Sequence, residues 1–132
     1  MIPVLVYPDV RAAVKWLSEA FGFAERLRIG EDHRSQMRIG VDGAVIVADV
    51  RREQQPPQPG VVTHLLKVRV ADVGAQVERA RAYGARIVQE PEEFEYGERE
   101  ATVEDLAGHR WQFTQTLRDV APEAWGGMTI EP

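Results

Sequence analysis

Hydrophobic and polar positions follow one pattern twice along this chain of 132 residues. An apolar run at residues 2–7 is typical of a strand, and apolar residues then recur at helical spacing from Val10 to Phe21. Asp9 is a favourable N-cap for that helix, and Gly22 is a favourable residue to end it in the left-handed conformation. The opening of the chain therefore predicts a strand followed by an amphipathic helix.

The same signals return in the second half. Residues 65–70 are strand-like, and Asp72 and Gly84 flank helical spacing over residues 73–83. Asp72 follows Asp9 by 63 positions, so the two segments form an internal repeat. Three strands are expected after each helix, at residues 24–29, 35–41 and 44–50 in the first copy and at 85–89, 98–104 and 109–116 in the second, where Pro91 separates two of them.

This order predicts an α+β fold made of two βαβββ modules in a single domain covering residues 1–132. The polar, proline-rich segment between the repeats is typical of a linker with no element of its own. The expected parts are module 1 at residues 1–50, the linker at 51–60, module 2 at 61–117 and a C-terminal tail at 118–132.

Composition excludes several classes of function. The chain has no cysteine, which excludes disulfides and thiolate metal sites, and we expect a cytoplasmic protein. The apolar N-terminal run is short and interrupted by prolines, so we expect neither a signal peptide nor a membrane span. The net charge is −5 and the basic residues are dispersed, which argues against nucleic acid as a partner. Six glutamates between positions 90 and 100 are interpreted as a solvated loop.

Two segments carry a resemblance to a known family. They are Phe21-Gly22-Phe23 in the first copy and YGEREATVEDLAGHRWQF, residues 96–113, in the second. The chain resembles the vicinal oxygen chelate superfamily, which includes glyoxalase I, bleomycin-resistance proteins and ring-cleaving dioxygenases; Leu106 departs from it, standing where the family usually has proline. The resemblance implies a curled mixed sheet with a concave cleft for a small-molecule ligand, and a homodimer.

Metal-dependent members of that superfamily take ligands from the first and last strands of each module. The resemblance places these positions at Ile2, Val47, Leu65 and Gln112. Three aliphatic side chains offer no lone pair to Zn, Fe, Ni or Mn, so we predict no metal and no cofactor. Strand alternation turns His64 away from this site but leaves Asp49 on the face of Val47.

Alternation also predicts which side chains face the cleft. Lys67 and Arg69 should face it together with Gln112, while Trp111 and Phe113 join the core. Lys67 and Arg69 could equally form ordinary ion pairs with nearby acids. The resemblance to relatives with a loop over the cleft adds Tyr96 and Arg99. The complete set of predicted ligand-binding residues is Val4, Val6, Arg38, Asp49, Lys67, Arg69, Tyr96, Arg99 and Gln112.

The histidines and serines suggest no catalytic centre. His33 beside a turn is expected to be exposed, His109 is expected to bond the backbone, and no serine lies in a nucleophile motif. The leading hypothesis is a metal-independent protein that sequesters an apolar or aromatic compound with a polar edge. The alternatives are a metal-dependent lyase, isomerase or dioxygenase using a set such as Asp49, His64 and Gln112, and a regulatory or scaffold subunit with a filled cleft.

Overall fold

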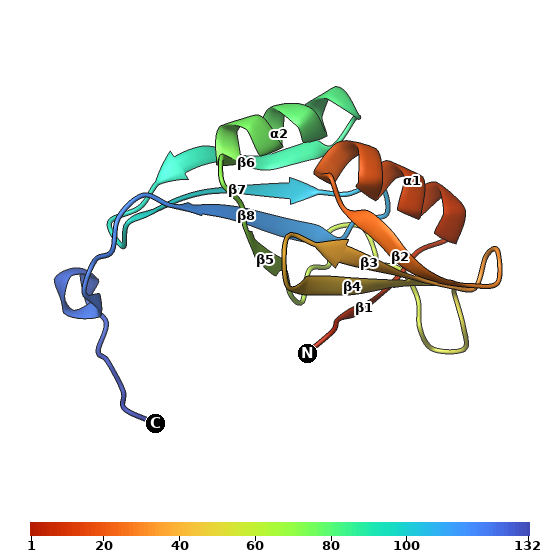
Figure 1. Ribbon diagram of the computed structural model, residues 1–132, viewed down its shortest axis with the longest axis horizontal. Coiled ribbons are helices and arrows are strands. Elements are labelled where there is room, and N and C mark those ends of the chain that lie inside the picture. Colours follow the sequence, from red (N-terminus) through yellow and green to blue (C-terminus); the bar gives the residue numbers. More distant parts are fainter.

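The computed structural model describes every residue from Met1 to Pro132. Two helices and eight strands alternate in the expected order, and a short 3₁₀-helix follows in the tail (Figure 1). The elements are β1 (Val4–Val6), α1 (Val10–Phe21), β2 (Ala24–Ile29), β3 (Arg34–Ile39), β4 (Gly43–Ala48), β5 (Leu66–Arg69), α2 (Val73–Ala82), β6 (Arg86–Glu93), β7 (Glu98–Glu104), β8 (Arg110–Thr116) and η1 (Pro122–Trp125).

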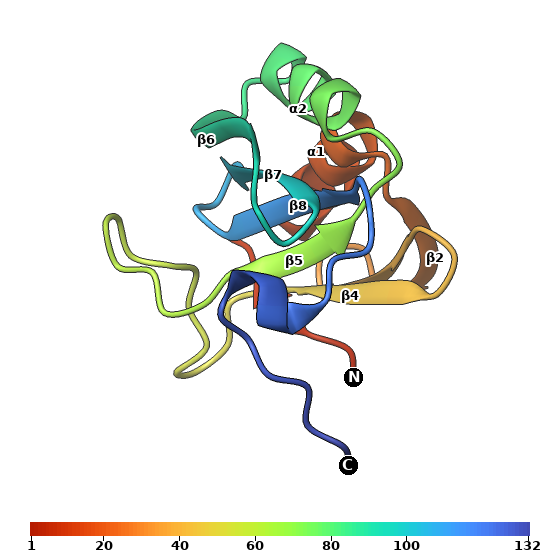
Figure 2. The same cartoon turned by 90° about the vertical axis from the view of Figure 1, so that its left-hand side faces the viewer.

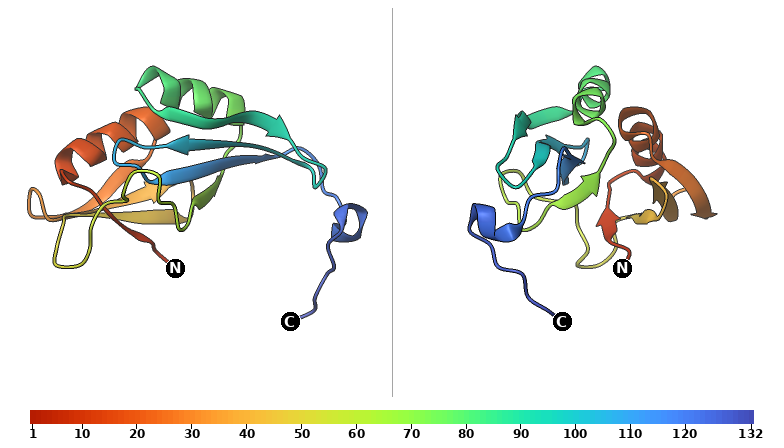
Figure 3. Two further views of the ribbon diagram at one scale, coloured as in Figure 1. Left: turned by 180° about the vertical axis from the view of Figure 1, so that it is seen from behind. Right: turned by 60° about the vertical axis from the view of Figure 1, so that its left-hand side comes forward.

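Each module forms its own four-stranded mixed sheet. The strand orders are β1-β4-β3-β2 and β5-β8-β7-β6, and the first strand of each module pairs in parallel with the last. Both helices lie on one side of the sheets, while both chain termini lie on the other (Figures 1 and 3). The predicted α+β fold with two βαβββ modules is confirmed, and neither sheet closes into a barrel.

The predicted caps explain where the helices begin and end. Asp9 accepts a hydrogen bond from Ala12 N at 3.0 Å, and Asp72 accepts the equivalent bond from Ala75 N at 3.1 Å. Gly22 ends α1 in the left-handed conformation, with φ of 79°. The repeated Asp signal in the sequence therefore marks two real helix starts.

The expected break at Pro91 was wrong, because β6 continues through it as far as Glu93. β6 is the outer strand of its sheet, and its pairing with β7 shifts register between Gln89 and Glu92. Proline lacks an N–H, so it is tolerated on an edge strand or at a bulge, and this position offers both.

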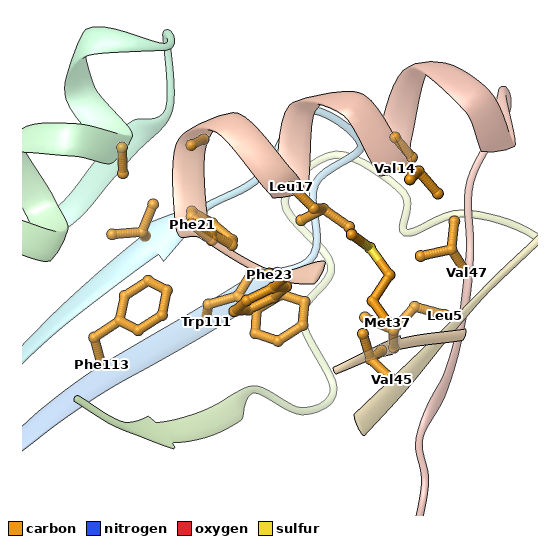
Figure 4. Packing of buried hydrophobic residues seen from close by; sticks show 14 of the residues in the cluster. Leu5, Val14, Leu17, Phe21, Phe23, Met37, Val45, Val47, Trp111 and Phe113 are labelled. Carbon is orange, nitrogen blue, oxygen red and sulfur yellow. The ribbon is translucent and has the colours of Figure 1, made fainter. Parts of the chain in front are cut away.

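One hydrophobic core runs beneath both helices. Leu17 and Met37 pack between α1 and its sheet, while Phe21, Phe23 and Trp111 meet where the two modules join (Figure 4). The Phe21 and Phe23 ring centroids lie 5.7 and 5.3 Å from that of Trp111. The tryptophan of module 2 is therefore buried against the aromatic end of module 1, as the sequence pattern predicted.

Hydrogen bonds between the helices hold the modules together. Gln76 Nε2 of α2 donates to Phe21 O at 2.9 Å, and Arg79 Nε donates to Glu19 O at 2.7 Å. Trp16 Nε1 of α1 donates in return to Tyr83 O at 2.8 Å. These carbonyls lie at helix C-termini, where no backbone N–H is available to them, so each helix completes the end of the other. Neither helix has the length and apolar character needed to cross a membrane.

Candidate functional site

The candidate site lies on the side of the sheets that carries no helix, which we call the helix-free face. Pairing places Lys67 beside Gln112 and Thr102, and Arg69 beside Thr114 and Glu100. Alternation turns Trp111 and Phe113 to the opposite side, where both are fully buried in the core. The prediction of which side chains of module 2 face the cleft and which face the core is therefore confirmed. The part of the helix-free face that module 2 supplies is polar.

Module 1 contributes an apolar part. Leu5 and Tyr7 are buried in the core, which leaves Val4 and Val6 on the helix-free face beside Ile46 and Ala48. Val4 is largely exposed, whereas Val6 is buried. Arg38 pairs with Ala44 on this face and is exposed. Val4, Val6 and Arg38 thus occupy the side on which the sequence placed them.

A buried carboxylate is the centre of the polar part. Glu100 is 2% exposed, and its Oε2 lies 2.8 Å from Lys67 Nζ. Its Oε1 accepts a hydrogen bond from Tyr96 Oη. Burial raises the pKa of Glu100, but the hydrogen bonds from Lys67 and Tyr96 outweigh it and hold the pKa below the ordinary value. Glu100 is therefore an anion that binds Lys67 and Tyr96 into one cluster.

Aromatic side chains surround this cluster. The Tyr96 ring stacks on Phe94 with centroids 5.4 Å apart, and Trp125 of the tail lies 5.5 Å from it at an angle. Burial, followed by the bond to Glu100, raises the pKa of Tyr96 to about 12, so its hydroxyl stays protonated at neutral pH. Lys67 Nζ lies 5.8 Å from the Tyr96 ring centroid, within cation–π range.

The two cations of β5 differ in how firmly they are held. Lys67 forms the close pair with Glu100, which supports the interpretation of an ordinary ion pair for this residue. Arg69 reaches only Glu98, at 3.8 Å, and its side chain is 75% exposed. Arg69 is therefore the more available of the two for an anion from solution.

Two predicted site residues lie away from the helix-free face. Arg99 lies against Gly74 in the first turn of α2, because it alternates with Glu98 and Glu100 along β7. Its expected position over the cleft was wrong.

Asp49 follows the end of β4, where its carboxylate lies 3.2 Å from His33 Nδ1 and 3.3 Å from Arg51 Nε. His33 is thus half-buried in contact with Asp49, which corrects its expected exposure. Burial raises the pKa of Asp49, but the bonds from His33 and Arg51 outweigh it and keep the pKa below normal. Asp49 therefore belongs to a pair at the strand end and does not line the helix-free face.

His109 confirms its expected backbone contact, with Nε2 2.8 Å from Val6 O. No three His, Cys, Asp or Glu side chains lie where they could hold a metal ion together. In the alternative set, Asp49 contacts His33 and Arg51 after β4, whereas Gln112 pairs with Lys67 on the helix-free face. His64 lies in the segment after the linker, where its Nδ1 is 3.2 Å from Thr63 Oγ1.

Two hollows lie where the modules meet, and each lies between the outer strand of one module and a hairpin turn of the other. The first has a volume of about 290 Å³ and is bounded by β1, the β7–β8 turn and linker residues such as Pro57. The second, about 1010 Å³, is bounded by β5 and the β3–β4 turn. We call this second hollow the seam groove; residues of β5 and β4 line it, and Figure 2 shows these two strands, with β5 above β4. Lys67 and Arg69 border it.

Comparison with known proteins identifies the family. A family model described as Glyoxalase/Bleomycin resistance protein/Dioxygenase superfamily matches residues 3–113. The chain belongs to this superfamily. Among solved structures, TioX from Micromonospora sp. ML1 is 35% identical with a TM-score of 0.73, and the match covers 89% of this chain and 98% of TioX.

Two further proteins are similar over most of the chain. TnmS3, an antibiotic binding protein from Streptomyces sp. CB03234, is 21% identical with a TM-score of 0.68, covering 87% of this chain and 93% of TnmS3; at that identity the likeness concerns the fold alone. The uncharacterized protein Mb0911c of Mycobacterium bovis is 29% identical over 127 residues, which are 89% of this chain and 84% of that protein.

The superfamily's metal positions need one correction here. Val47 was expected on the cleft, but it is fully buried under α1, and Ile46 faces the helix-free side instead. Val47 follows Gly43 by four residues, as Gln112 follows Gly108, and this count gave the expected position. The β3–β4 turn has three residues between its strands, whereas the β7–β8 turn has five, so the same count does not reach the equivalent position in the two modules. Gln112 pairs with Lys67, as Ile46 pairs with Val4.

With this correction, the donor set is Ile2, Ile46, Leu65 and Gln112. Three hydrocarbon side chains and one amide supply no imidazole and no carboxylate, so these residues do not fit a transition metal.

Sequence reasoning missed Glu100, which it assigned to a solvated acidic run. Alternation along β7 from Glu98 to Thr102 places Glu100 on the face of Lys67, so this signal was present in the pattern. Its burial was not, because it depends on Tyr96 and Lys67 lying over it.

Proposed function

We propose that this chain is a metal-independent binding protein that holds an apolar or aromatic compound with a polar edge against its helix-free face. The proposal rests on one observation: the superfamily's metal positions carry Ile2, Ile46, Leu65 and Gln112, none of which is an imidazole or a carboxylate. Such a face can offer apolar contact and a few polar groups, which is the usual make-up of a small-molecule site.

The two parts of the face suit the two parts of such a ligand. Val4 and Ile46 offer apolar contact from module 1, while Gln112 and Lys67 offer polar groups from module 2. TnmS3, which shares this fold, is an antibiotic binding protein, so the scaffold is compatible with ligand binding. We further propose that the chain acts as one domain, in a cytoplasmic homodimer that covers this face, with neither nucleic acid nor membrane as a partner.

Binding and metal content can be tested together. Purified protein is first checked for metal by mass spectrometry and is then titrated calorimetrically, before and after EDTA treatment, with flat aromatic compounds that carry a carbonyl group. We expect saturable binding that EDTA does not change, a higher melting temperature with ligand, and recovery of the ligand unaltered. A stoichiometric transition metal, or conversion of the compound, would overturn the proposal.

A matched pair of variants locates the site. Val4 and Val50 are 43% and 42% exposed, but only Val4 lies on the helix-free face beside Ile46. Val4→Gln is expected to weaken binding about tenfold because it adds a polar group to the apolar wall, whereas Val50→Gln leaves binding unchanged. Equal effects from the two variants would contradict this location. Sedimentation velocity tests the dimer independently.

A further inference from the structure

The two hollows between the modules are related by the internal repeat. Val4 and Lys67 each precede their helix cap by five residues, and each lies at a hollow bounded by a hairpin of the other module. The two hollows are therefore at equivalent positions in the fold. The groups found at the first hollow indicate what kind of group can bind at the second.

At the first hollow, beside β1, side chains of the protein itself fill most of the space. Tyr7 inserts a fully buried ring there, its hydroxyl 2.6 Å from Asp105 Oδ2 and its ring centroid 4.8 Å from that of His109. Pro57 of the linker and Val61, which follows the linker, border what is left, and the remaining hollow is about 290 Å³. An aromatic ring with a polar substituent thus occupies this position in module 1.

At the second hollow, the seam groove beside β5, there is no counterpart of the Tyr7 ring or of the linker. Val70 stands at the position of Tyr7, two residues before the helix cap, and the facing turn has only the three residues Gly40, Val41 and Asp42. No linker passes over it, and the seam groove has a volume of about 1010 Å³. Grooves of this size accept drug-sized organic molecules.

The walls and the charge of the seam groove define what fits. Twelve of its 21 lining residues are hydrophobic, and they include Phe23, Ile39 and Trp111 at its inner end. Its border carries Lys67, Arg69 and Arg79 against the single acid Asp42, although the chain as a whole has a net charge of −5. A ligand with an apolar body and an anionic end matches both features.

Arg69 is the cation that can receive the anion. Arg79 donates to Glu19 O at 2.7 Å and Lys67 is paired with Glu100 at 2.8 Å, so both are engaged. Arg69 has only a distant partner at 3.8 Å and is 75% exposed. Its guanidinium can offer two parallel N–H donors to a carboxylate.

We propose that the seam groove is a second binding site, specific for an aromatic acid whose ring enters the apolar groove and whose carboxylate binds Arg69. This site adjoins the helix-free face and shares Lys67 and Arg69 with its border, but its apolar walls are the residues at the seam, such as Phe23, Ile39 and Trp111. The ring of the aromatic acid would lie in module 2 at the position equivalent to that of the Tyr7 ring in module 1.

The test compares naphthalene-2-carboxylate with naphthalene-2-carboxamide, which has nearly the same shape but no charge. Calorimetry on the full chain is expected to give at least about tenfold tighter binding of the acid. Arg69→Gln should abolish this preference. Arg52→Gln, which alters an exposed arginine of the linker with no ion pair, should keep it. Equal affinity for both compounds, or a preference that survives Arg69→Gln, would overturn the proposal.

A second variant separates this site from the helix-free face. Val68 lines the seam groove and is half-buried, and alternation along β5 turns it away from the helix-free face, so Val68→Phe places a ring in the groove and should abolish binding of the acid. Val4→Gln should leave that binding intact. The reverse result would refute the seam groove and support the helix-free face. If Val68→Phe changes only the oligomeric state in sedimentation, a second copy of the chain covers the groove and the proposal fails.

Discussion

The Tyr7 hydroxyl donates a 2.6 Å hydrogen bond to Asp105 Oδ2 and thereby links the first strand of module 1 to the β7–β8 turn of module 2. Trp111 Nε1 donates to the same oxygen at 3.0 Å, and the other carboxylate oxygen accepts from the backbone N–H groups of Ala107 and His109. Every donor around Asp105 is thus matched to an oxygen, and the two modules of one chain are held together at a buried point.

Removing the Tyr7 hydroxyl should weaken this link. Tyr7→Phe is expected to lower the free energy of unfolding by about 2 kcal/mol, because a buried hydrogen bond to a carboxylate is lost. Urea denaturation measures the change. Tyr83→Phe is the control, since the Tyr83 side chain is largely exposed, and it should cost less than about 0.5 kcal/mol. Equal losses would show that the bond contributes nothing.

Two tyrosines should resist ionisation. Burial and then Asp105 raise the pKa of Tyr7 well above 10.0, and burial and then Glu100 raise the pKa of Tyr96 to about 12. Because the folded-state pKa is the higher one, the stabilisation is complete below pH 10 and is lost as the pH rises through 12 for Tyr96. Absorbance at alkaline pH, compared between the chain and Tyr96→Phe, should show the titration near pH 12 disappear, while the late titration of Tyr7 remains. A Tyr96 that ionises at its ordinary pKa would contradict the buried contact with Glu100.

The two cations of β5 should differ in their effect on stability. Lys67→Met is expected to lower the free energy of unfolding by about 1–2 kcal/mol, because it leaves the buried Glu100 carboxylate without its cation. Arg69→Met should cost less than about 0.5 kcal/mol, because its pair is distant and solvated. Chemical denaturation of both variants measures the difference. Adding Glu100→Gln to Lys67→Met should recover part of the loss, and a double variant less stable than the single one would contradict the pairing.

Gly97 should tolerate no side chain. A Cβ at Gly97 would lie 2.2 Å from Arg118 O, and φ is +85°. Its carbonyl also accepts the Leu117 N–H at 2.8 Å, so this turn attaches the tail. Gly97→Ala is expected to cost more than about 2 kcal/mol. Gly40→Ala, with φ of +61° and nothing within 4 Å, isolates the backbone strain at about 1 kcal/mol. Thermal unfolding compares them, and similar losses would show that the tail does not pack against Gly97.

Much of the architecture was readable because its signals are local. The caps Asp9 and Asp72 start both helices, and strand alternation assigned Lys67, Gln112 and Trp111 to the correct faces. The errors arose where distant segments decide the outcome. Val47 was misplaced because two hairpins differ in length. Arg99 was misplaced because the resemblance put it over the cleft, whereas alternation along β7 turns it toward α2.

The sequence by itself determined the repeat, the helix ends and the aliphatic character of the superfamily's metal positions, since these follow from residue type and spacing along the chain. Only the tertiary structure decided that Glu100 is a buried anion and that one meeting place of the modules is filled while the other stays open. The physical reason is that burial and cavity volume depend on which distant side chains arrive at a point. Tyr7 reaches Asp105 across 98 positions, whereas the equivalent position in module 2 is Val70, which lines a groove of about 1010 Å³.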